Sequence, residues 1–139
     1  MTYHLDTNAV IAILRDRPVE VRARLRQALD EGASVALSSI VVFELWYGVA
    51  RSQQQRANAE RLGVFLSGNV EVVPLGEEAA QAAGRLRAAL EAQGTPIGPF
   101  DLLIAAQALA SRATLVTSNV SEFARVRELA WVDWAVAQE

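Results

Sequence analysis

Short apolar runs alternate along this chain with longer stretches in which apolar residues recur at helical spacing. The runs predict four strands and a shorter fifth, over residues 3–6, 34–37, 70–73, 114–117 and 131–132. The longer stretches predict helices over residues 9–14, 18–32, 40–50, 53–67, 77–93, 99–109 and 122–126. Strands that alternate with helices indicate an α/β fold, with a parallel sheet of four to five strands flanked by helices on both faces.

Cap and breaker residues mark the junctions between these elements. Asp6 and Ser38 follow apolar runs directly and are residue types that cap helices. Pro99 suits the first turn of a helix, and the Gly- and Pro-rich stretch before it breaks the chain. No repeat or linker interrupts the 139 residues, so we expect one domain over 1–139.

The composition narrows the possible location and chemistry. No apolar stretch is long enough to span a membrane, and the N-terminus lacks the features of a signal peptide, so we expect a soluble cytoplasmic protein with no membrane contact. The chain has no Cys, no Lys and one His. Most common nucleophiles and the paired His of acid–base ribonucleases are therefore missing. His4, which lies inside the first strand, is expected to have a structural role.

The basic residues are all Arg, and the formal net charge is −3. A negative chain is not expected to bind nucleic acid indiscriminately, because such binding depends on neutralising phosphates. Arg nevertheless suits bidentate phosphate contacts. Arg85, Arg87 and Arg125 are candidates for such contacts, and the alternative is that they lie on solvated helix faces.

Four acidic residues stand where apolar runs meet helix signals. They are Asp6, Glu44, Asp101 and Glu122. Ligands of open parallel sheets bind beyond the carboxyl ends of the strands, so acids at these positions are expected to converge. Carboxylates brought together raise one another's pKa unless a cation neutralises them, and Mg²⁺ or Mn²⁺ prefers such oxygen ligands. Taken singly, each acid reads as a helix cap or a surface charge.

The chemistry that suits such a site is metal-assisted hydrolysis of a phosphodiester bond. Other uses of an α/β sheet with acids at its edge fit less well. A phosphotransfer receiver domain and a P-loop protein both need a Lys, which this chain lacks. A phosphatase of the haloacid-dehalogenase type needs an acid two residues after its Asp, where this chain has Asn8.

Several groups of residues, spread over nearly the whole chain, form one ordered pattern. They are Leu5-Asp6-Thr7-Asn8, Phe43-Glu44-Leu45 with Tyr47-Gly48, Pro96-Ile97-Gly98-Pro99-Phe100-Asp101, Ile104-Ala105-Ala106, Leu115-Val116-Thr117-Ser118-Asn119, Glu122-Phe123 and Val132-Asp133-Trp134. With them the chain resembles the PIN-domain ribonucleases and, within them, the VapC toxins of bacterial toxin–antitoxin pairs. The Gly-Pro-Phe-Asp run and the Asn-x-x-Glu-Phe segment look most like the branch that cuts initiator tRNA in the anticodon loop.

The resemblance implies a role for each acid. Asp6, Glu44 and Asp101 correspond to the acidic triad that binds Mg²⁺, for which Mn²⁺ substitutes, and Asp6 and Asp101 correspond to its direct ligands. Many relatives have a fourth acid where this chain has Asn119, and here Glu122 takes that part, touching metal directly or through water. The residues expected to orient carboxylates and waters are Thr7, Asn8, Thr117 and Asn119.

The resemblance also implies partners. These are an RNA substrate, most often tRNA, a VapB-type antitoxin, a second copy of the chain in a homodimer, higher-order assembly with the antitoxin, and operator DNA bound only through the antitoxin. Helices over 40–50 and 53–67 are candidates for a dimer face or an antitoxin groove, and burial in the core is the alternative. A housekeeping RNA-processing nuclease and a non-catalytic PIN module that binds RNA or protein remain as alternative functions.

Overall fold

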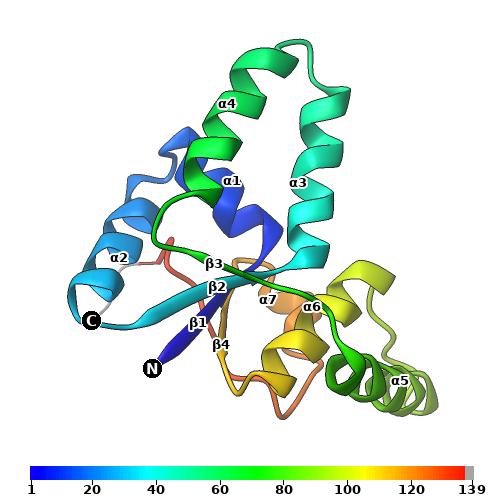
Figure 1. Cartoon of the computed structure of the whole chain (residues 1–139). Coiled ribbons are helices and arrows are strands. Elements are labelled where there is room, and N and C mark those ends of the chain that lie inside the picture. The colour runs from blue at the N-terminus through cyan, green and yellow to red at the C-terminus, as the bar shows by residue number, and fades with distance from the viewer. Residues whose placement is uncertain (137–139) are drawn as a thin grey trace.

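A five-stranded parallel sheet forms the centre of the computed structural model, which describes residues 1–136 (Figure 1). The strands are β1 (Thr2–Leu5), β2 (Ser34–Ser38), β3 (Glu71–Val73), β4 (Thr114–Val116) and β5 (Trp131–Val132). All four neighbouring pairs are parallel. The predicted α/β fold is confirmed. The single domain over 1–139 stays a prediction, and its last three residues lie outside the described ones.

The described residues also form seven helices. They are α1 (Thr7–Arg15), α2 (Val19–Asp30), α3 (Ser39–Arg51), α4 (Gln55–Leu66), α5 (Glu77–Ala92), α6 (Pro99–Ala110) and α7 (Val120–Phe123). Figure 1 shows α1 to α4 on one side of the sheet and α5 with α6 on the other. No described helix is both long and apolar enough to cross a membrane.

The sheet changes winding direction at its centre. The strand order is β3-β2-β1-β4-β5, so the chain moves outward from β1 to β3 and then returns to the opposite side of β1. Because parallel crossovers are almost always right-handed, this reversal places helices on both faces. It also opens a crevice at the carboxyl ends of β1 and β4, which is where ligands bind in folds of this type.

The hydrophobic core holds the two central strands in place. Leu5 at the end of β1 and Leu115 in β4 are fully buried, and Val10 and Val41 pack over them from α1 and α3. Fully burying side chains of this size stabilises a fold by about 1.5–3 kcal/mol each. The carboxyl ends of β1 and β4 therefore lie directly against the buried core.

The last helix begins earlier than the sequence pattern predicts. It was expected over 122–126, whereas α7 spans Val120–Phe123. The backbone N–H of Asn119 donates to Oγ1 of Thr117 at 2.9 Å, which turns the chain sharply after β4. Phe123, only 1% exposed, then anchors the helix in the core. The turn and this anchor together explain the shift, which places Glu122 in the first turn of α7.

Candidate active site

Asp6 lies at the centre of the crevice, between the end of β1 and the start of α1. Its Oδ1 accepts a hydrogen bond at 2.8 Å from the backbone N–H of Ala9, so the side chain caps α1 while being only 3% exposed. Burial raises the pKa of Asp6 to about 6, and the charges of Glu44 and Asp133 act in the same direction. Hydrogen bonds from Thr117 and Ala9 oppose this rise. Asp6 therefore caps α1, while its burial disfavours the ionised form of its carboxyl group.

Glu44 reaches the crevice from the middle of α3. The hydroxyl of Thr7, the first residue of α1, donates to its Oε1 at 2.5 Å across 37 residues of sequence. This bond fixes the direction of the carboxylate, and the charge of Glu44 raises the pKa of both Asp6 and Asp101. Thr7 therefore holds the carboxylate of Glu44 in one orientation, and its role in the site stays a prediction.

Asp101 and Glu122 form a pair on the opposite side of the crevice. Asp101 stands in the first turn of α6 and Glu122 in the first turn of α7. Burial raises the pKa of Asp101 to about 7, and its hydrogen bond to Glu122 and the charges of Glu122, Glu44 and Asp6 add to the rise. The pair therefore carries one proton, held by Asp101, under mildly acidic conditions.

Neutral donors hold Glu122 in its ionised form. The backbone N–H of Gly98 donates to its Oε1 at 2.5 Å, and Nδ2 of Asn119 donates to its Oε2 at 2.9 Å. The Gly98 contact is the main cause that lowers the pKa of Glu122, and Asp101, Asn119 and the nearby Arg125 act in the same direction. Asn119 thus orients the acid that stands three residues after it.

Gly98 is a site residue that the sequence did not single out. A Cβ at this position would lie 3.3 Å from Oε1 of Glu122 and 3.9 Å from Oδ2 of Asp101. Any larger residue would therefore crowd the acidic pair. The Gly-Pro-Phe-Asp run contains this glycine, but its spacing does not show that its N–H faces α7.

Asp133 is a second residue to which the sequence analysis gave no role in the site, although it belongs to the Val132-Asp133-Trp134 segment of the sequence pattern. It follows β5 directly, and its Oδ1 accepts hydrogen bonds from the Ser118 hydroxyl at 2.8 Å and the Ala135 N–H at 2.9 Å. Its charge raises the pKa of Asp6. Its place after the last parallel strand was the signal that could have found it.

Of the two remaining residues predicted to orient carboxylates and waters, the structure places one beside an acid and the other in solvent. Thr117 is buried beside Asp6, whereas Asn8 is exposed and makes no side-chain hydrogen bond among residues 1–136.

Of the three predicted phosphate contacts, only Arg125 lies near the acids. It donates to the carbonyl of Pro96 at 2.6 Å and lies near Glu122. Arg87 pairs instead with Glu91 on the exposed face of α5, and neither it nor Arg85 is among the groups that shift the pKa of Asp6, Asp101 or Glu122.

The acidic side chains suit a hard divalent cation. No three His, Cys, Asp or Glu side chains among residues 1–136 are close enough to enclose a metal ion by themselves. Mg²⁺ does not need such a cage, because it commonly uses one or two carboxylates and completes its shell with water and phosphate. Burial, and after it the neighbouring carboxylates, raise the pKa of Asp6 and Asp101, and a bound cation would favour the ionised form of both.

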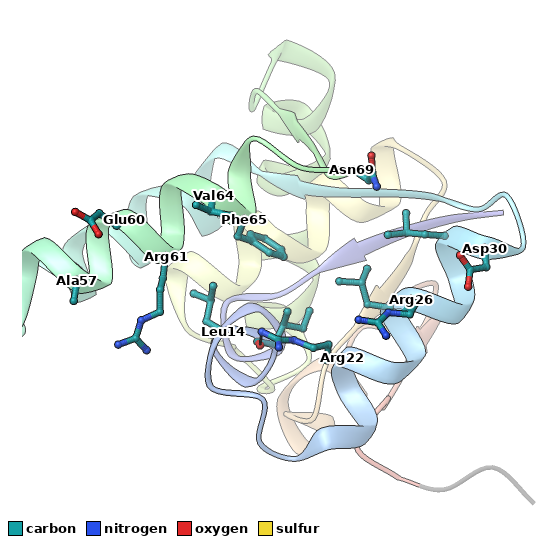
Figure 2. Close-up of a pocket in the computed structure, with 13 residues that line it drawn as sticks. Leu14, Arg22, Arg26, Asp30, Ala57, Glu60, Arg61, Val64, Phe65 and Asn69 are labelled. Carbon is teal, nitrogen blue, oxygen red and sulfur yellow. Dashed lines mark hydrogen bonds between the residues drawn. The ribbon is translucent and has the colours of Figure 1, made fainter.

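A separate cleft of about 790 Å³ lies between α2 and α4, with α1 at its base (Figure 2). Apolar side chains of α1, α2 and α4 line it, together with Arg22, Arg26 and Arg61. Figure 2 shows Leu14 and Phe65 among these side chains, between the two helices. None of the four acids lines the cleft, so it is distinct from the acidic crevice.

Comparison with known proteins identifies the class to which this fold and acidic crevice belong. Residues 3–129 match the PIN domain, and the chain belongs to the PIN-domain family. It is 39% identical over 134 residues to ribonuclease VapC2 of Rickettsia felis, covering 96% of this chain and 98% of the relative. It is 36% identical over 135 residues to the tRNA(fMet)-specific endonuclease VapC of Shigella flexneri, covering 97% and 99%.

Solved structures agree with the sequence relatives. VapBC2 of Rickettsia felis, bound to a DNA fragment from its promoter, contains a chain that superposes with a TM-score of 0.90 at 36% identity, covering 96% of this chain and 99% of that one. VapBC-1 of nontypeable Haemophilus influenzae gives 0.87 at 34% identity, covering 98% and 100%. The family resemblance predicted from the motifs is confirmed, and the relatives are ribonucleases.

Proposed function

We propose that this protein is a divalent-metal-dependent endoribonuclease that acts as the VapC-type toxin of a toxin–antitoxin pair. The observation that carries the proposal is that the charges of Glu122, Glu44 and Asp6, which come from α7, α3 and the end of β1, all act on Asp101 in α6. Relatives of nearly the same length that are 36–39% identical are named as ribonucleases or endonucleases, which supports phosphodiester hydrolysis. The intact acidic set favours a catalytic protein over a binding module.

Within this site, Asp6 and Asp101 hold the cation directly, while Glu44 and Glu122 contact it directly or through water. Mg²⁺ is the proposed ion, and Mn²⁺ substitutes for it. A bound cation of this kind supplies a Lewis acid that offsets charge on a phosphodiester and favours ionisation of water. Thr7 orients Glu44, Asn119 orients Glu122, and Thr117 donates to Asp6.

The proposed substrate is a structured RNA, and initiator tRNA cut in its anticodon loop is the specific choice. The support is that the Shigella flexneri relative is named a tRNA(fMet)-specific endonuclease, together with the contact between Gly98 and Glu122 that joins the two motifs of that branch. Cleavage of that tRNA would stop translation. Arg125, which lies beside Glu122, is the predicted phosphate contact that this geometry favours.

The proposed partner is a VapB-type antitoxin expressed in the same cytoplasm. Similar chains occur in VapBC complexes, some of them bound to DNA, and we propose that operator DNA is reached only through the antitoxin. The apolar and Arg-lined cleft between α2 and α4 has the character of a groove for an amphipathic helix that carries acidic residues. A homodimer, and larger assemblies with the antitoxin, complete the proposal.

The direct test is cleavage of purified initiator tRNA and a panel of other RNAs. Cleavage is expected with Mg²⁺ or Mn²⁺ and is expected to stop in EDTA. Full activity in EDTA would contradict the metal requirement. Induction in cells should arrest growth, and co-expression of a cognate VapB-type antitoxin should reverse the arrest. Sequencing of RNA 5′ ends after induction identifies the target. Cleavage of the purified RNAs without growth arrest on induction would favour a housekeeping nuclease.

Replacing Thr7 with Val is expected to reduce kcat by about 10- to 100-fold, because residues that orient metal-binding carboxylates typically have effects of this size. Val keeps the shape of the side chain but removes the hydroxyl that donates to Glu44. Thr7→Ser retains the hydroxyl and is the matched control. Steady-state cleavage kinetics distinguish the two variants, and equal loss in both would show that the methyl group, not the hydrogen bond, matters.

A further inference from the structure

We propose that a pocket between α1, α3 and α4 binds one unpaired nucleobase of the RNA next to the bond that is cut. This inference rests on the ribonuclease function proposed above. The pocket has a volume of about 210 Å³ and adjoins the wider cleft between α2 and α4, with which it shares Leu14 and Arg61. Glu44 forms part of its wall. Since Glu44 also belongs to the acidic site, a base in the pocket would leave its own phosphate beside the carboxylates.

The walls of the pocket suit a flat, mostly apolar group. They are formed by Ile11, Leu14, Leu45, Val49 and Leu62. The volume is below the ~300–1,000 Å³ of pockets that enclose drug-sized ligands, so one base fits the pocket better than a larger group. RNA-binding proteins commonly read unpaired bases that are turned out of loops into such sites.

The polar groups of the pocket are arranged to read the edge of a base. Nδ2 of Asn58 donates to Oγ of Ser52 at 3.0 Å, and Oγ of Ser52 donates to the carbonyl of Val49 at 2.7 Å. This relay fixes the orientation of the Asn58 carboxamide. Its Oδ1 accepts no hydrogen bond from residues 1–136 and is available to an amino group of a base.

Two exposed arginines, Arg15 and Arg61, also line the pocket. Neither takes part in the hydrogen bonds or salt bridges found among residues 1–136. The neighbouring carboxylates repel RNA, and guanidinium groups beside them offset that repulsion and suit phosphate. The two arginines would also suit the carboxylates of an acidic peptide, so it is the small volume of the pocket and its place beside Glu44, rather than its charges, that favour a nucleotide.

A glycine in α3 allows the pocket to be filled without disturbing the fold. Gly48 lines the pocket, and a Cβ added there would meet no atom within 4 Å. Gly48→Leu therefore places a side chain in the pocket and also removes a helix-destabilising glycine. Gly63 in α4 is equally open, but it lines neither this pocket nor the α2–α4 cleft. Gly63→Leu is the matched control.

Both variants are expected to melt at or above the temperature of the parent protein. For Gly48→Leu we expect KM for the RNA to rise by about tenfold, because the new side chain would exclude the base and remove its apolar contacts with the pocket walls. Its kcat at saturating RNA should stay within about threefold, because the carboxylates are untouched. Gly63→Leu should leave both constants unchanged. Equal KM values for all three proteins would overturn the proposal.

Substrates that lack one base separate this inference from the proposed function. In the parent protein, an abasic position next to the scissile bond should raise KM by a factor similar to that of Gly48→Leu, and the two changes together should add little. If the parent does not cleave RNA at all, the ribonuclease function fails. If it cleaves RNA but abasic and intact substrates behave alike, only the base pocket fails. Loss of antitoxin binding without loss of RNA affinity would assign the pocket to the antitoxin and overturn the proposal.

Discussion

Replacing Asp6 with Asn is expected to lower RNA cleavage by about a thousandfold or more while making the metal-free protein more stable above pH 6. The activity loss follows from the proposed position of Asp6 as a direct ligand. A bound metal contributes several kcal/mol of charge stabilisation, and each 1.4 kcal/mol corresponds to about tenfold in rate. Asn has the same shape and still caps α1, because its Oδ1 accepts the Ala9 N–H.

The stability gain follows from the pKa of Asp6, which burial raises from 3.8 to about 6 in the folded chain. A raised pKa means that the folded state binds the proton more tightly than the unfolded state does. Ionisation therefore destabilises the fold progressively between pH 3.8 and about pH 6, and the full penalty remains at higher pH. Asn carries no charge, so the variant avoids a penalty of about 3 kcal/mol.

Thermal melting in EDTA at pH 8 and pH 4 measures this effect. At pH 8 the Asp6→Asn variant should melt about 10 °C above the parent protein, and at pH 4 the gain should fall to about 2 °C. Glu71→Gln removes a charge from the exposed strand β3 and serves as the control, with no such pH-dependent gain. An Asp6→Asn variant that is less stable at pH 8 would show that the carboxylate supports the fold rather than straining it.

Asp101→Asn is expected to abolish cleavage as completely as Asp6→Asn, whereas Glu122→Gln should reduce it by about 10- to 100-fold. The reason is the different position of the two acids. Asp101 experiences the charges of Glu122, Glu44 and Asp6, so it lies at the centre of the acidic set. Glu122 is held at its edge by the N–H of Gly98 and by Asn119.

Gln at position 122 still offers an oxygen to the Gly98 N–H, which keeps the loop before α6 in place. Cleavage rates of the two single variants and the double variant, measured over a series of Mg²⁺ concentrations, test the ranking. The Glu122 variant should recover part of its activity at high Mg²⁺, while the Asp101 variant should not. Equal and unrecoverable losses would mean that Glu122 is a direct ligand of the same importance.

Much of the fold was predictable because its signals are local. Apolar runs and helical spacing identified every strand and helix, and cap residues such as Asp6 placed most boundaries within a few residues. The end of the chain was harder to read, since α7 depends on a turn between Thr117 and Asn119 and on burial of Phe123. Such a turn has no periodicity from which it could be recognised.

The candidate site was predictable in its members but not in its contacts. In a parallel sheet the carboxyl ends of all strands lie at the same edge, whatever the strand order. Asp6, which follows a strand, and Asp101, which begins a helix, could therefore be predicted to lie at that edge. The partners of these acids were different, because a backbone N–H such as that of Gly98 leaves no mark in a sequence. Asp133 was overlooked because a lone acid near a chain end resembles an ordinary surface charge.

By itself, the sequence determined the α/β class, the acidic character of the site and the absence of Lys and Cys chemistry, because these depend on residue types and local periodicity. Only the tertiary structure decided the order β3-β2-β1-β4-β5, which sets Asp6 beside Thr117. It also decided that Thr7 orients Glu44 and that a pocket lies on the other side of Glu44. Such features depend on how distant segments pack, and a pattern of apolar and polar positions specifies which faces are buried but not which neighbours they meet.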